Sequence, residues 1–323
     1  MEVSDRFSAD IIGGNKMKYG VVIVTYNRLE LLKECVEQCL NQTVPFERIV
    51  IVNNCSTDGT KEYLEQYNEN PEFVISNQTE NLGGAGGFRV GLALAQQEDL
   101  DWILIIDDDA MIASDYIRQC DKIIRRRPNM VACSGTVYTQ GKIQTSHRRV
   151  IVNQLLCLEK NVPLSAYEQK SFHYDLATFC GLMVRGDILR KIGLPKSEYF
   201  IWYDDTEYSM RLRQYGGIVN INAAHLNHKT VLPTGKQAGF FARMSWRTYY
   251  GHRNRLDAVK AHCKPVTTAV IIAEFLVFIA CGYGMQLIPS KRKQGRYIAR
   301  MLRDALKDGY HGVLGKNEKY SPN

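Results

Sequence analysis

Residues 102–112, WILIIDDDAMI, carry the pattern that decides the fold, an apolar run that ends in three adjacent aspartates. The run from Trp102 to Ile106 has the length and β-branched content of a strand buried on both faces. In open α/β sheets, ligands collect at the carboxyl ends of such strands. Neighbouring carboxylates repel one another, and a hard divalent cation such as Mg²⁺ or Mn²⁺, shared with phosphate oxygens, would compensate them. A solvated turn or a helix cap would also place aspartates here, so the rest of the chain must decide.

The composition indicates a globular protein. Its 323 residues, 45% of them hydrophobic, suffice for one large α/β domain and a smaller appendage. The net charge of +7 suits anionic lipid or phosphorylated ligands, whereas no aromatic-interleaved basic motif points to nucleic acid. Nine cysteines without a Cys-x-x-Cys pair favour reduced thiols in the cytoplasm. Residues 1–16 are polar, lack the apolar core of a signal peptide, and are expected to form a flexible tail.

Strands and helices alternate through the first part of the chain. Apolar, β-branched segments at 19–25, 49–52 and 72–76 predict strands, and the amphipathic segment 29–40 predicts a helix between the first two. This repeat predicts a doubly wound, mostly parallel sheet with right-handed crossovers.

The segment 81–91 contains five glycines in its last nine residues. We expect it to form a loop that leads into a helix ending near residue 97. Such a loop at a helix N-terminus can hold phosphate, although a flexible turn is an equal alternative.

Beyond the aspartates, a helix over 114–126 and a strand over 131–138 are expected, and the pattern then weakens over 141–171. An insertion of this kind shapes the substrate pocket in many α/β enzymes.

A second acid cluster, with Asp204, Asp205 and Glu207, begins another predicted helix directly after Trp202 and Tyr203. Helix capping accounts for acids at a helix N-terminus. A carboxylate beside aromatic rings that stack on a sugar also suits a general base.

Two histidines, His225 and His228, follow a strand predicted at 217–221. A neutral imidazole from either one can complete a metal site begun by Asp109, and a structural histidine is the alternative.

Six segments, taken together and in order, resemble the inverting family 2 glycosyltransferases of GT-A fold, in particular the galactofuranosyltransferase-like and rhamnosyltransferase branch. They are VVIVTYNR (21–28), IVNNCSTDGT (51–60), NLGGAGGFRVG (81–91), IIDDDA (105–110), CGLMVRGDILRKIGLP (180–195) and FIWYDDTEYSMRLRQYG (200–216). One such motif would be weak, but an ordered set is strong. The resemblance, over about residues 17–255, implies a GT-A domain at 17–245, with a nucleotide-sugar half at 17–110 and an acceptor half at 111–245.

The resemblance also implies roles for individual residues. The nucleotide and its phosphates would contact Thr25, Tyr26, Arg28, Asn54, Asp58, Arg89, Asp107 and Asp108, with Asp107 at the ribose and Arg89 at the phosphates. Asp109 and His228 would hold Mn²⁺ or Mg²⁺, with His225 as the alternative ligand. Asp205 would be the general base, and the sugar and acceptor would contact Gly84, Trp202 and Asp204.

The C-terminal part, 246–323, is expected to be helical and to associate with membranes. Residues 246–256 resemble the Tyr-Tyr-x-x-Arg-Asn element of this branch. The apolar stretch 266–285 approaches the length of a bilayer span, but Glu274 in its middle favours a buried or interfacial helix. Basic residues over 291–303, interleaved with apolar ones, predict a helix on an anionic membrane, a bundle surface or a contact with a second copy of the chain.

The implied function is the transfer of a sugar from a UDP- or dTDP-linked donor to a hydroxyl of a cell-surface glycan, carried on a polyprenyl lipid. The glycine-rich segment most resembles enzymes that use UDP-galactofuranose, so we prefer that donor over dTDP-rhamnose. The implied location is the inner face of the plasma membrane. A nucleotidyltransferase is disfavoured because the segment 25–28 has no glycine. A non-catalytic scaffold subunit that binds nucleotide sugars is a further alternative.

Overall fold

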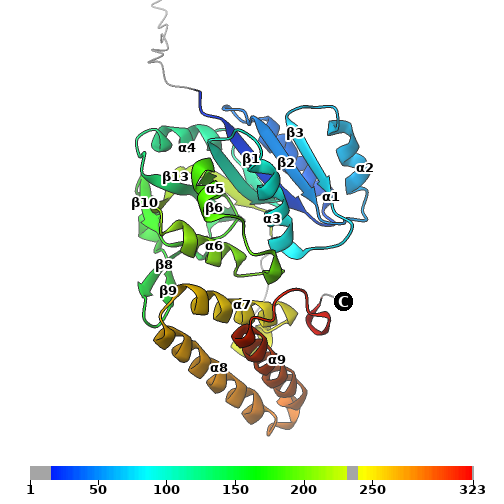
Figure 1. The fold of residues 1–323 in the computed structure, drawn as a ribbon, viewed down its shortest axis with the longest axis vertical. Helices are drawn as coiled ribbons and strands as arrows, with labels where there is room; N and C mark the ends of the chain where they lie inside the picture. Colours follow the sequence, from blue (N-terminus) through cyan, green and yellow to red (C-terminus); the bar gives the residue numbers. More distant parts are fainter. Residues whose placement is uncertain (1–15, 231–238, 322–323) are drawn as a thin grey trace, which may run out of the picture.

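The computed structural model describes residues 16–230 and 239–321, which form a sheet-based part and a C-terminal group of helices (Figure 1). The predicted tail at 1–16 lies outside the described residues except for Lys16. In the sheet-based part a ten-stranded sheet has the order β10-β13-β6-β12-β4-β1-β2-β3, with β5 and β7 paired to β13 and β6. Pairing is parallel from β3 to β4 and between β13 and β6, while β12 runs antiparallel between these two groups.

The first half of the sheet alternates strands and helices, as the sequence predicts. Its elements are β1 (Tyr19–Thr25), α1 (Leu29–Leu40), β2 (Arg48–Asn53), α2 (Thr60–Leu64), β3 (Phe73–Asn77), α3 (Gly83–Ala95) and β4 (Trp102–Asp107). The helices cover both faces, because Leu32 of α1 packs in one apolar cluster and Phe88 of α3 in the other. The carboxyl ends of β1 and β4 therefore meet at one edge, where the first acid cluster lies.

The second half of the sheet continues with shorter elements. These are β5 (Ala110–Ile112), α4 (Tyr116–Ile124), β6 (Met130–Thr139), β7 (Lys142–Ile143), β10 (Ser171–Tyr174), β12 (Leu182–Arg185), α5 (Gly186–Ile192), α6 (Asp204–Leu212) and β13 (Gly217–His228). The segment 141–171, where the sequence pattern weakens, contributes to a separate small sheet of β8 (Arg148–Asn153), β9 (Leu158–Asn161) and β11 (Leu176–Ala177).

The glycine-rich segment is helical, which corrects the expected loop. Helix α3 begins at Gly83, so most of the glycines lie within its first turns. A Cβ atom at Gly91 would lie 2.3 Å from Cγ1 of Val22 on β1. Glycine thus lets α3 approach the sheet more closely than any other residue would, and this packing outweighs its poor helix propensity.

The C-terminal helices are α7 (Trp246–His262), α8 (Pro265–Met285) and α9 (Arg292–His311). A capping box of Ser245 and Thr248 starts α7, and Pro265 opens α8. Only one stripe of α8 is buried, with Ile271, Phe275 and Ile279 among its residues, and it packs in an apolar cluster with α7 and α9. Helix α8 is long and apolar enough to cross a membrane, and 28% of its most apolar 18-residue window is buried in the protein.

Candidate active site

The two acid clusters, far apart in the sequence, face one cavity. This cavity, called here the acid cavity, has a volume of about 380 Å³ and lies between the carboxyl end of β4, the start of α6 and the end of β13. Of the residues predicted from the sequence, it is lined by Arg28, Gly84, Asp107, Asp109, Trp202, Asp204, Asp205 and His228. The sheet topology thus brings together, in one cavity, residues for which the resemblance implies only separate roles.

The first acid cluster is only partly neutralised by its surroundings. The Arg28 guanidinium donates to Asp108 at 3.2 Å and to Asp109 at 2.7 Å, and the Thr25 hydroxyl donates to Asp108 at 2.7 Å. Burial and the charges of Asp109 and Asp108 raise the pKa of Asp107 to about 7. Burial also raises the pKa of Asp108 to about 6, against the opposing effects of Thr25 and Arg28. The cluster has more negative charge than one guanidinium compensates.

Asp109 and His228 fit a divalent cation. Asp109 Oδ1 lies 3.2 Å from His228 Nε2, close to the separation of about 3 Å expected for adjacent ligands of an octahedral ion. Asp109 Oδ1 is buried and has no hydrogen-bond partner among the described residues. His225, by contrast, is exposed, packs edge-on against Tyr138 and does not line the acid cavity. Of the two candidate histidines, the fold places His228 beside the acids.

The second acid cluster opens α6 in a strained backbone. Phe200, Trp202 and Tyr203 all have positive φ angles, of 64°, 64° and 74°. Such conformations cost about 1–3 kcal/mol each and cluster at functional sites. Burial raises the pKa values of Asp204 and Asp205, and the charge of Asp205 raises that of Asp204 further. A carboxylate with a raised pKa accepts a proton more readily, as a general base requires.

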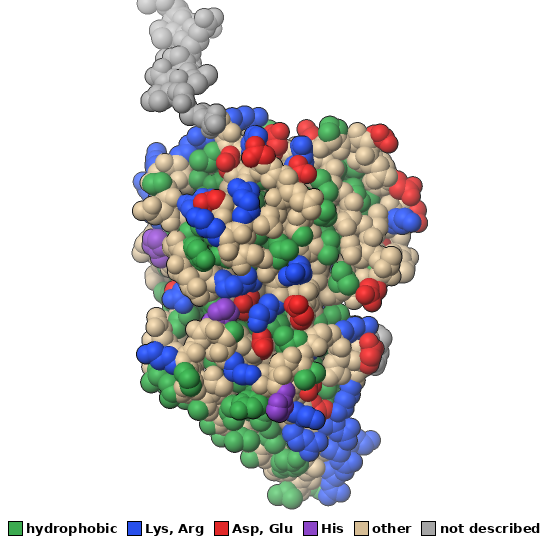
Figure 2. Space-filling view, viewed as in Figure 1, with side chains coloured by type: hydrophobic (Ala, Val, Ile, Leu, Met, Phe, Trp, Pro, Cys, Tyr) green, Lys and Arg blue, Asp and Glu red, His purple; other side chains and the backbone are tan. Residues whose placement is uncertain are grey.

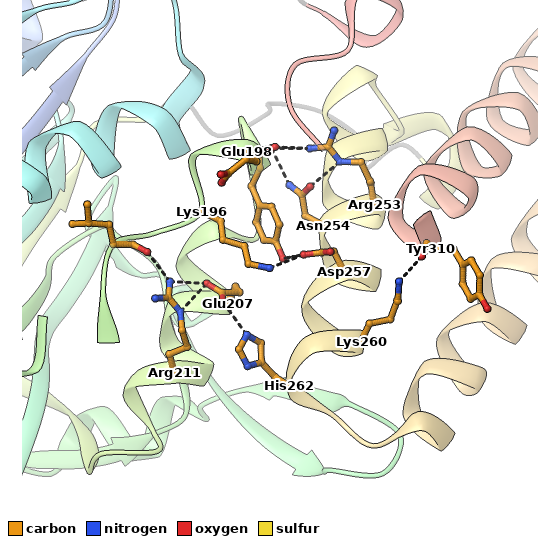
Figure 3. A network of polar contacts seen from close by, with 12 residues as sticks. Lys196, Glu198, Glu207, Arg211, Arg253, Asn254, Asp257, Lys260, His262 and Tyr310 are labelled. Carbon is orange, nitrogen blue, oxygen red and sulfur yellow. Dashed lines mark hydrogen bonds and ion pairs between the residues drawn. The ribbon is translucent and has the colours of Figure 1, made fainter. Parts of the chain in front are cut away.

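Helix α7 holds the segment that precedes these acids, residues 198–203, called here the Trp202 loop. Asn254 Nδ2 donates to the carbonyls of Trp202 at 2.8 Å and Ile201 at 3.2 Å, and Arg253 Nη2 donates to that of Glu198 at 3.1 Å. Figure 3 shows Arg253 and Asn254 reaching from α7 toward Glu198. The Arg-Asn pair of the Tyr-Tyr-x-x-Arg-Asn element therefore positions the acid cavity.

A network of buried ion pairs connects α6 to α7, starting from Glu207 in the first turn of α6. Glu207 accepts hydrogen bonds from Arg211 at 2.8 Å and lies 2.8 Å from His262 Nε2 (Figure 3). Burial alone would raise the pKa of Glu207, but His262 and Arg211 hold it below its usual range. The ionised Glu207 thus fixes α6, which carries Asp205, against the C-terminal helices.

Other residues predicted to bind the nucleotide lie outside the acid cavity. Asn54 is buried and donates to the Gly83 carbonyl at 3.0 Å, which fixes the start of α3. Asp58 accepts from the Leu29 backbone N–H at 2.9 Å and, with Arg28, lines a neighbouring cavity of about 360 Å³. Tyr26 is 44% exposed.

Arg89 points away from the donor site that the resemblance implies. Its guanidinium donates to the Pro195 carbonyl at 3.1 Å and lines a separate cavity. It stands five residues after Gly84 on α3, which turns its side chain about 140° from the face lining the acid cavity. The structure thus gives no support for the predicted contact with the donor phosphates.

Sequence reasoning missed several residues of the acid cavity: His147, Thr178, Cys180 and Arg247. Cys180 is the first residue of the motif at 180–195, and Arg247 lies in the segment 246–256 that contains the Tyr-Tyr-x-x-Arg-Asn element, so the motifs could have identified both. His147 lies in the segment without a pattern, and no sequence signal identifies it. Burial and the charge of Arg148 lower the pKa of His147 to about 3, which keeps its imidazole neutral.

Comparison with known proteins places these features in a family. The model of glycosyl transferase family 2 matches residues 20–191. The chain is 37% identical over 105 residues to a poly(ribitol-phosphate) beta-glucosyltransferase of Bacillus spizizenii, covering 31% of this chain and 16% of that protein. It is 25% identical over 198 residues to the galactofuranosyltransferase GlfT1 of Mycolicibacterium smegmatis, covering 60% of this chain and 65% of that protein. The matches thus span less than two thirds of these relatives.

The fold has a clear counterpart among solved structures. The crystal structure of GalNAc-T7 with UDP, GalNAc and Mn²⁺ superposes with a TM-score of 0.62 at 14% identity, over 93% of this chain and 57% of that one. This likeness shows the fold alone, and it confirms the predicted α/β architecture of GT-A type with a helical region after it.

Proposed function

The chain belongs to glycosyl transferase family 2, and from this premise we propose that it is an inverting glycosyltransferase that moves a sugar from a nucleotide donor to an acceptor hydroxyl. One observation carries the proposal: Asp107 and Asp109 share the acid cavity with Asp204 and Asp205. A donor site and a base site in one cavity are what a single displacement between two bound substrates needs.

The donor would lie along the carboxyl ends of the first strands. The neighbouring cavity with Asp58 shares Arg28 with the acid cavity, so a nucleotide in the first can extend its diphosphate into the second. Arg28 and Arg247 supply positive charge on this path. Asp109 and His228 would hold Mn²⁺ or Mg²⁺, and the bound ion would stabilise the negative charge that builds on the diphosphate as the glycosidic bond breaks.

Asp205 would act as the base. Its carboxylate takes the proton of the acceptor hydroxyl, whose oxygen forms a bond to the anomeric carbon as the bond from that carbon to the diphosphate breaks. The nucleoside diphosphate leaves from the opposite face, so the configuration inverts. Trp202, which is 48% exposed, offers its indole for stacking on the acceptor sugar beside Asp204.

UDP-galactofuranose is the donor that we prefer. The likeness to galactofuranosyltransferase GlfT1 supports this choice. dTDP-rhamnose is the alternative donor. A scaffold subunit that binds nucleotide sugars without turnover is the alternative function.

Release of nucleoside diphosphate by the purified protein tests the proposal. The assay uses Mn²⁺ or Mg²⁺, a donor panel of UDP-galactofuranose, UDP-galactopyranose, UDP-glucose and dTDP-rhamnose, and a membrane extract as the source of a polyprenyl-linked glycan acceptor. Asp205→Asn should reduce release by about 10²–10⁴-fold while donor binding persists, because loss of a general base acts on the chemical step. Asp99→Asn is the control, because Asp99 pairs with Lys18 on the surface. Donor binding without any release would favour the scaffold, and unchanged release would remove Asp205 as the base.

We further propose that the enzyme works on the inner face of the plasma membrane and docks through α8 and α9. Figure 2 shows hydrophobic side chains gathered over α8 and Lys and Arg side chains over the adjoining tip of α9. Leu276 and Val277 on α8 are 55% and 60% exposed, and the basic residues Lys291, Arg292, Lys293, Arg296, Arg300 and Arg303 are all exposed. An apolar face beside a basic one suits the surface of an anionic bilayer.

Vesicle sedimentation tests this location. Replacing Leu276 and Val277 together by glutamate should abolish sedimentation with phosphatidylglycerol vesicles, whereas Leu164→Glu, at an equally exposed leucine outside these helices, should not. Equal sedimentation of the α8 variant and the control would contradict the proposal. Sedimentation with neutral vesicles alone would contradict the part assigned to the basic residues.

A further inference from the structure

A group of nitrogen and sulfur ligands shares the acid cavity with the carboxylates. His147 lies just before β8, Cys180 in the turn between β11 and β12, and His228 at the end of β13, and one ligand atom of each lies within 4.8 Å of the other two. All three residues line the acid cavity. The proposed transfer uses His228 alone among them, so His147 and Cys180 have no task in it.

Each histidine is arranged as a metal ligand. His147 Nδ1 lies 2.7 Å from the Thr178 hydroxyl, which fixes the ring and leaves Nε2 available. His228 Nε2 lies 3.2 Å from the Asp109 carboxylate, and its Nδ1 is buried without a hydrogen-bond partner among the described residues. An oxygen beside one ring nitrogen commonly orients metal-binding histidines. The two rings meet edge to face at 5.5 Å between centroids.

We propose that His147, Cys180 and His228 bind one Zn²⁺ ion. Two imidazoles and a thiolate match the ligand preference of zinc and not that of Mg²⁺ or Mn²⁺, which favour oxygen. Ligand atoms around tetrahedral zinc are separated by about 3.5 Å, so the group must contract by about 1 Å. The Cys180 thiol releases its proton to solvent when it binds the ion.

This site overlaps the cation site of the proposed function because both use His228. A neutral imidazole that binds one ion through Nδ1 carries its proton on Nε2, which then cannot bind a second ion beside Asp109. If the transfer proposal holds, zinc therefore competes with Mn²⁺ or Mg²⁺ and inhibits the enzyme. Divalent affinity for nitrogen ligands rises from Mn²⁺ to Zn²⁺, so zinc should inhibit at concentrations well below those of the activating ion.

Cobalt spectroscopy of the full-length protein, without donor or acceptor, tests the site. Co²⁺ bound by a thiolate gives a sulfur-to-cobalt charge-transfer band in the near ultraviolet and tetrahedral bands in the visible. We expect both in the wild type, loss of the charge-transfer band in Cys180→Ser, and weakened tetrahedral bands in His147→Gln. Cys120→Ser, at another buried cysteine that does not line the acid cavity, should retain both.

Zn²⁺ added to the cobalt-loaded protein should bleach the bands, and far-ultraviolet circular dichroism establishes that each variant is folded. A wild type without a charge-transfer band, or a folded Cys180→Ser protein that retains it, would overturn the proposal. The readout requires no turnover, so a protein with the cobalt bands but no transferase activity would contradict the proposed function and leave the zinc site standing. In an active enzyme, Cys180→Ser should raise the zinc concentration for half inhibition, relative to its own Mn²⁺-supported rate, at least tenfold.

Discussion

Replacing Asn254 by alanine should weaken sugar transfer far more than donor binding. The Asn254 amide donates to the carbonyls of Ile201 and Trp202, and no other hydrogen bond to these two carbonyls occurs among the described residues. Asn254 does not line the acid cavity, so the substitution removes a support of the Trp202 loop without removing a substrate contact.

The magnitude follows from the two carbonyls that lose their partner, because the Tyr199 carbonyl, which also accepts from Asn254, keeps a hydrogen bond from Arg253. The two carbonyls are partly buried, and each should cost about 1 kcal/mol when it loses its partner, the low end of the range for buried groups. A loss of about 2 kcal/mol changes the population of the strained loop by up to about 30-fold. The positive φ angles of Phe200, Trp202 and Tyr203 are strained, so the Trp202 loop lowers its free energy by leaving this conformation once the hydrogen bonds from Asn254 are lost.

Steady-state kinetics and calorimetry with UDP measure the two effects separately. We expect kcat/KM for transfer to fall by up to about 30-fold while the Kd for UDP changes less than twofold. Lys260→Ala is the matched control, because Lys260 lies on the same helix and donates to the Tyr310 carbonyl instead (Figure 3). Transfer within twofold of the wild type, or UDP affinity that falls as far as transfer, would refute the positioning role of Asn254.

Three further outcomes follow from the geometry. Gly83→Ala should destabilise the protein by more than about 1–2 kcal/mol, because φ at Gly83 is +71° and a Cβ would lie 2.1 Å from the Phe200 carbonyl oxygen. Gly84→Ala, its control, should leave the melting temperature unchanged or raise it, because nothing lies within 4 Å of its Cβ and alanine has the better helix propensity. The acid limb of the pH profile of kcat/KM should have its midpoint above the ordinary aspartate pKa of about 3.9. The reason is that burial raises the pKa of Asp205 and that only the ionised carboxylate accepts a proton. A midpoint at or below that value would exclude Asp205 as the base. Glu207→Gln should lower the free energy of unfolding, measured in urea at neutral pH, by about 2–4 kcal/mol. Because the pKa of Glu207 is lowered in the folded protein, this difference between variant and wild type should shrink as the pH falls through that pKa. A difference that stays constant with pH would contradict the stabilising role of the ionised Glu207.

The first half of the fold was predictable because its signals are local. The strand predicted at 19–25 and the helix predicted at 29–40 match β1 and α1 residue for residue. The continuous apolar run of β1 reflects burial on both faces, the helical period of α1 reflects one buried face, and each pattern lies within a single element. The glycine-rich helix was not predictable in this way, because glycine disfavours helices and only the contact with β1 explains it.

Strand β13 shows a different limit. The sequence predicts a strand at 217–221, and the structure extends it to His228. A register shift between Ile221 and His225 interrupts the alternation of side chains that marks a strand. This irregular part of the strand brings His228 to Asp109, so the feature that hides the strand from sequence reading also builds the candidate cation site.

The candidate site also contains residues that local patterns predict and residues that only the tertiary structure brings to it. Asp107, Asp109 and Asp205 stand in ordered motifs at element ends, and the topology of an α/β sheet brings such ends together. His147, by contrast, enters the acid cavity from the small sheet region, whose position no local pattern specifies. Arg89 also stands in a motif, but its side chain lies outside the acid cavity, because a motif gives a neighbourhood and not the helix face on which a side chain lies.

The domain boundary that the resemblance suggests at residue 245 does not coincide with the limit of the acid cavity. Helix α7 lies beyond it, yet Arg247 lines the acid cavity and Asn254 holds the Trp202 loop. The same helix pairs Arg255 with Glu274 at 2.8 Å, so the carboxylate in the middle of α8 is neutralised within the protein. This pair removes much of the cost that an unpaired carboxylate would have at a membrane surface, and it favours an interfacial helix over a span, because a span would carry the pair into hydrocarbon. Since α7 contacts both the loop and α8, docking of α8 on a bilayer would also fix the orientation of the acid cavity toward an acceptor held in that bilayer.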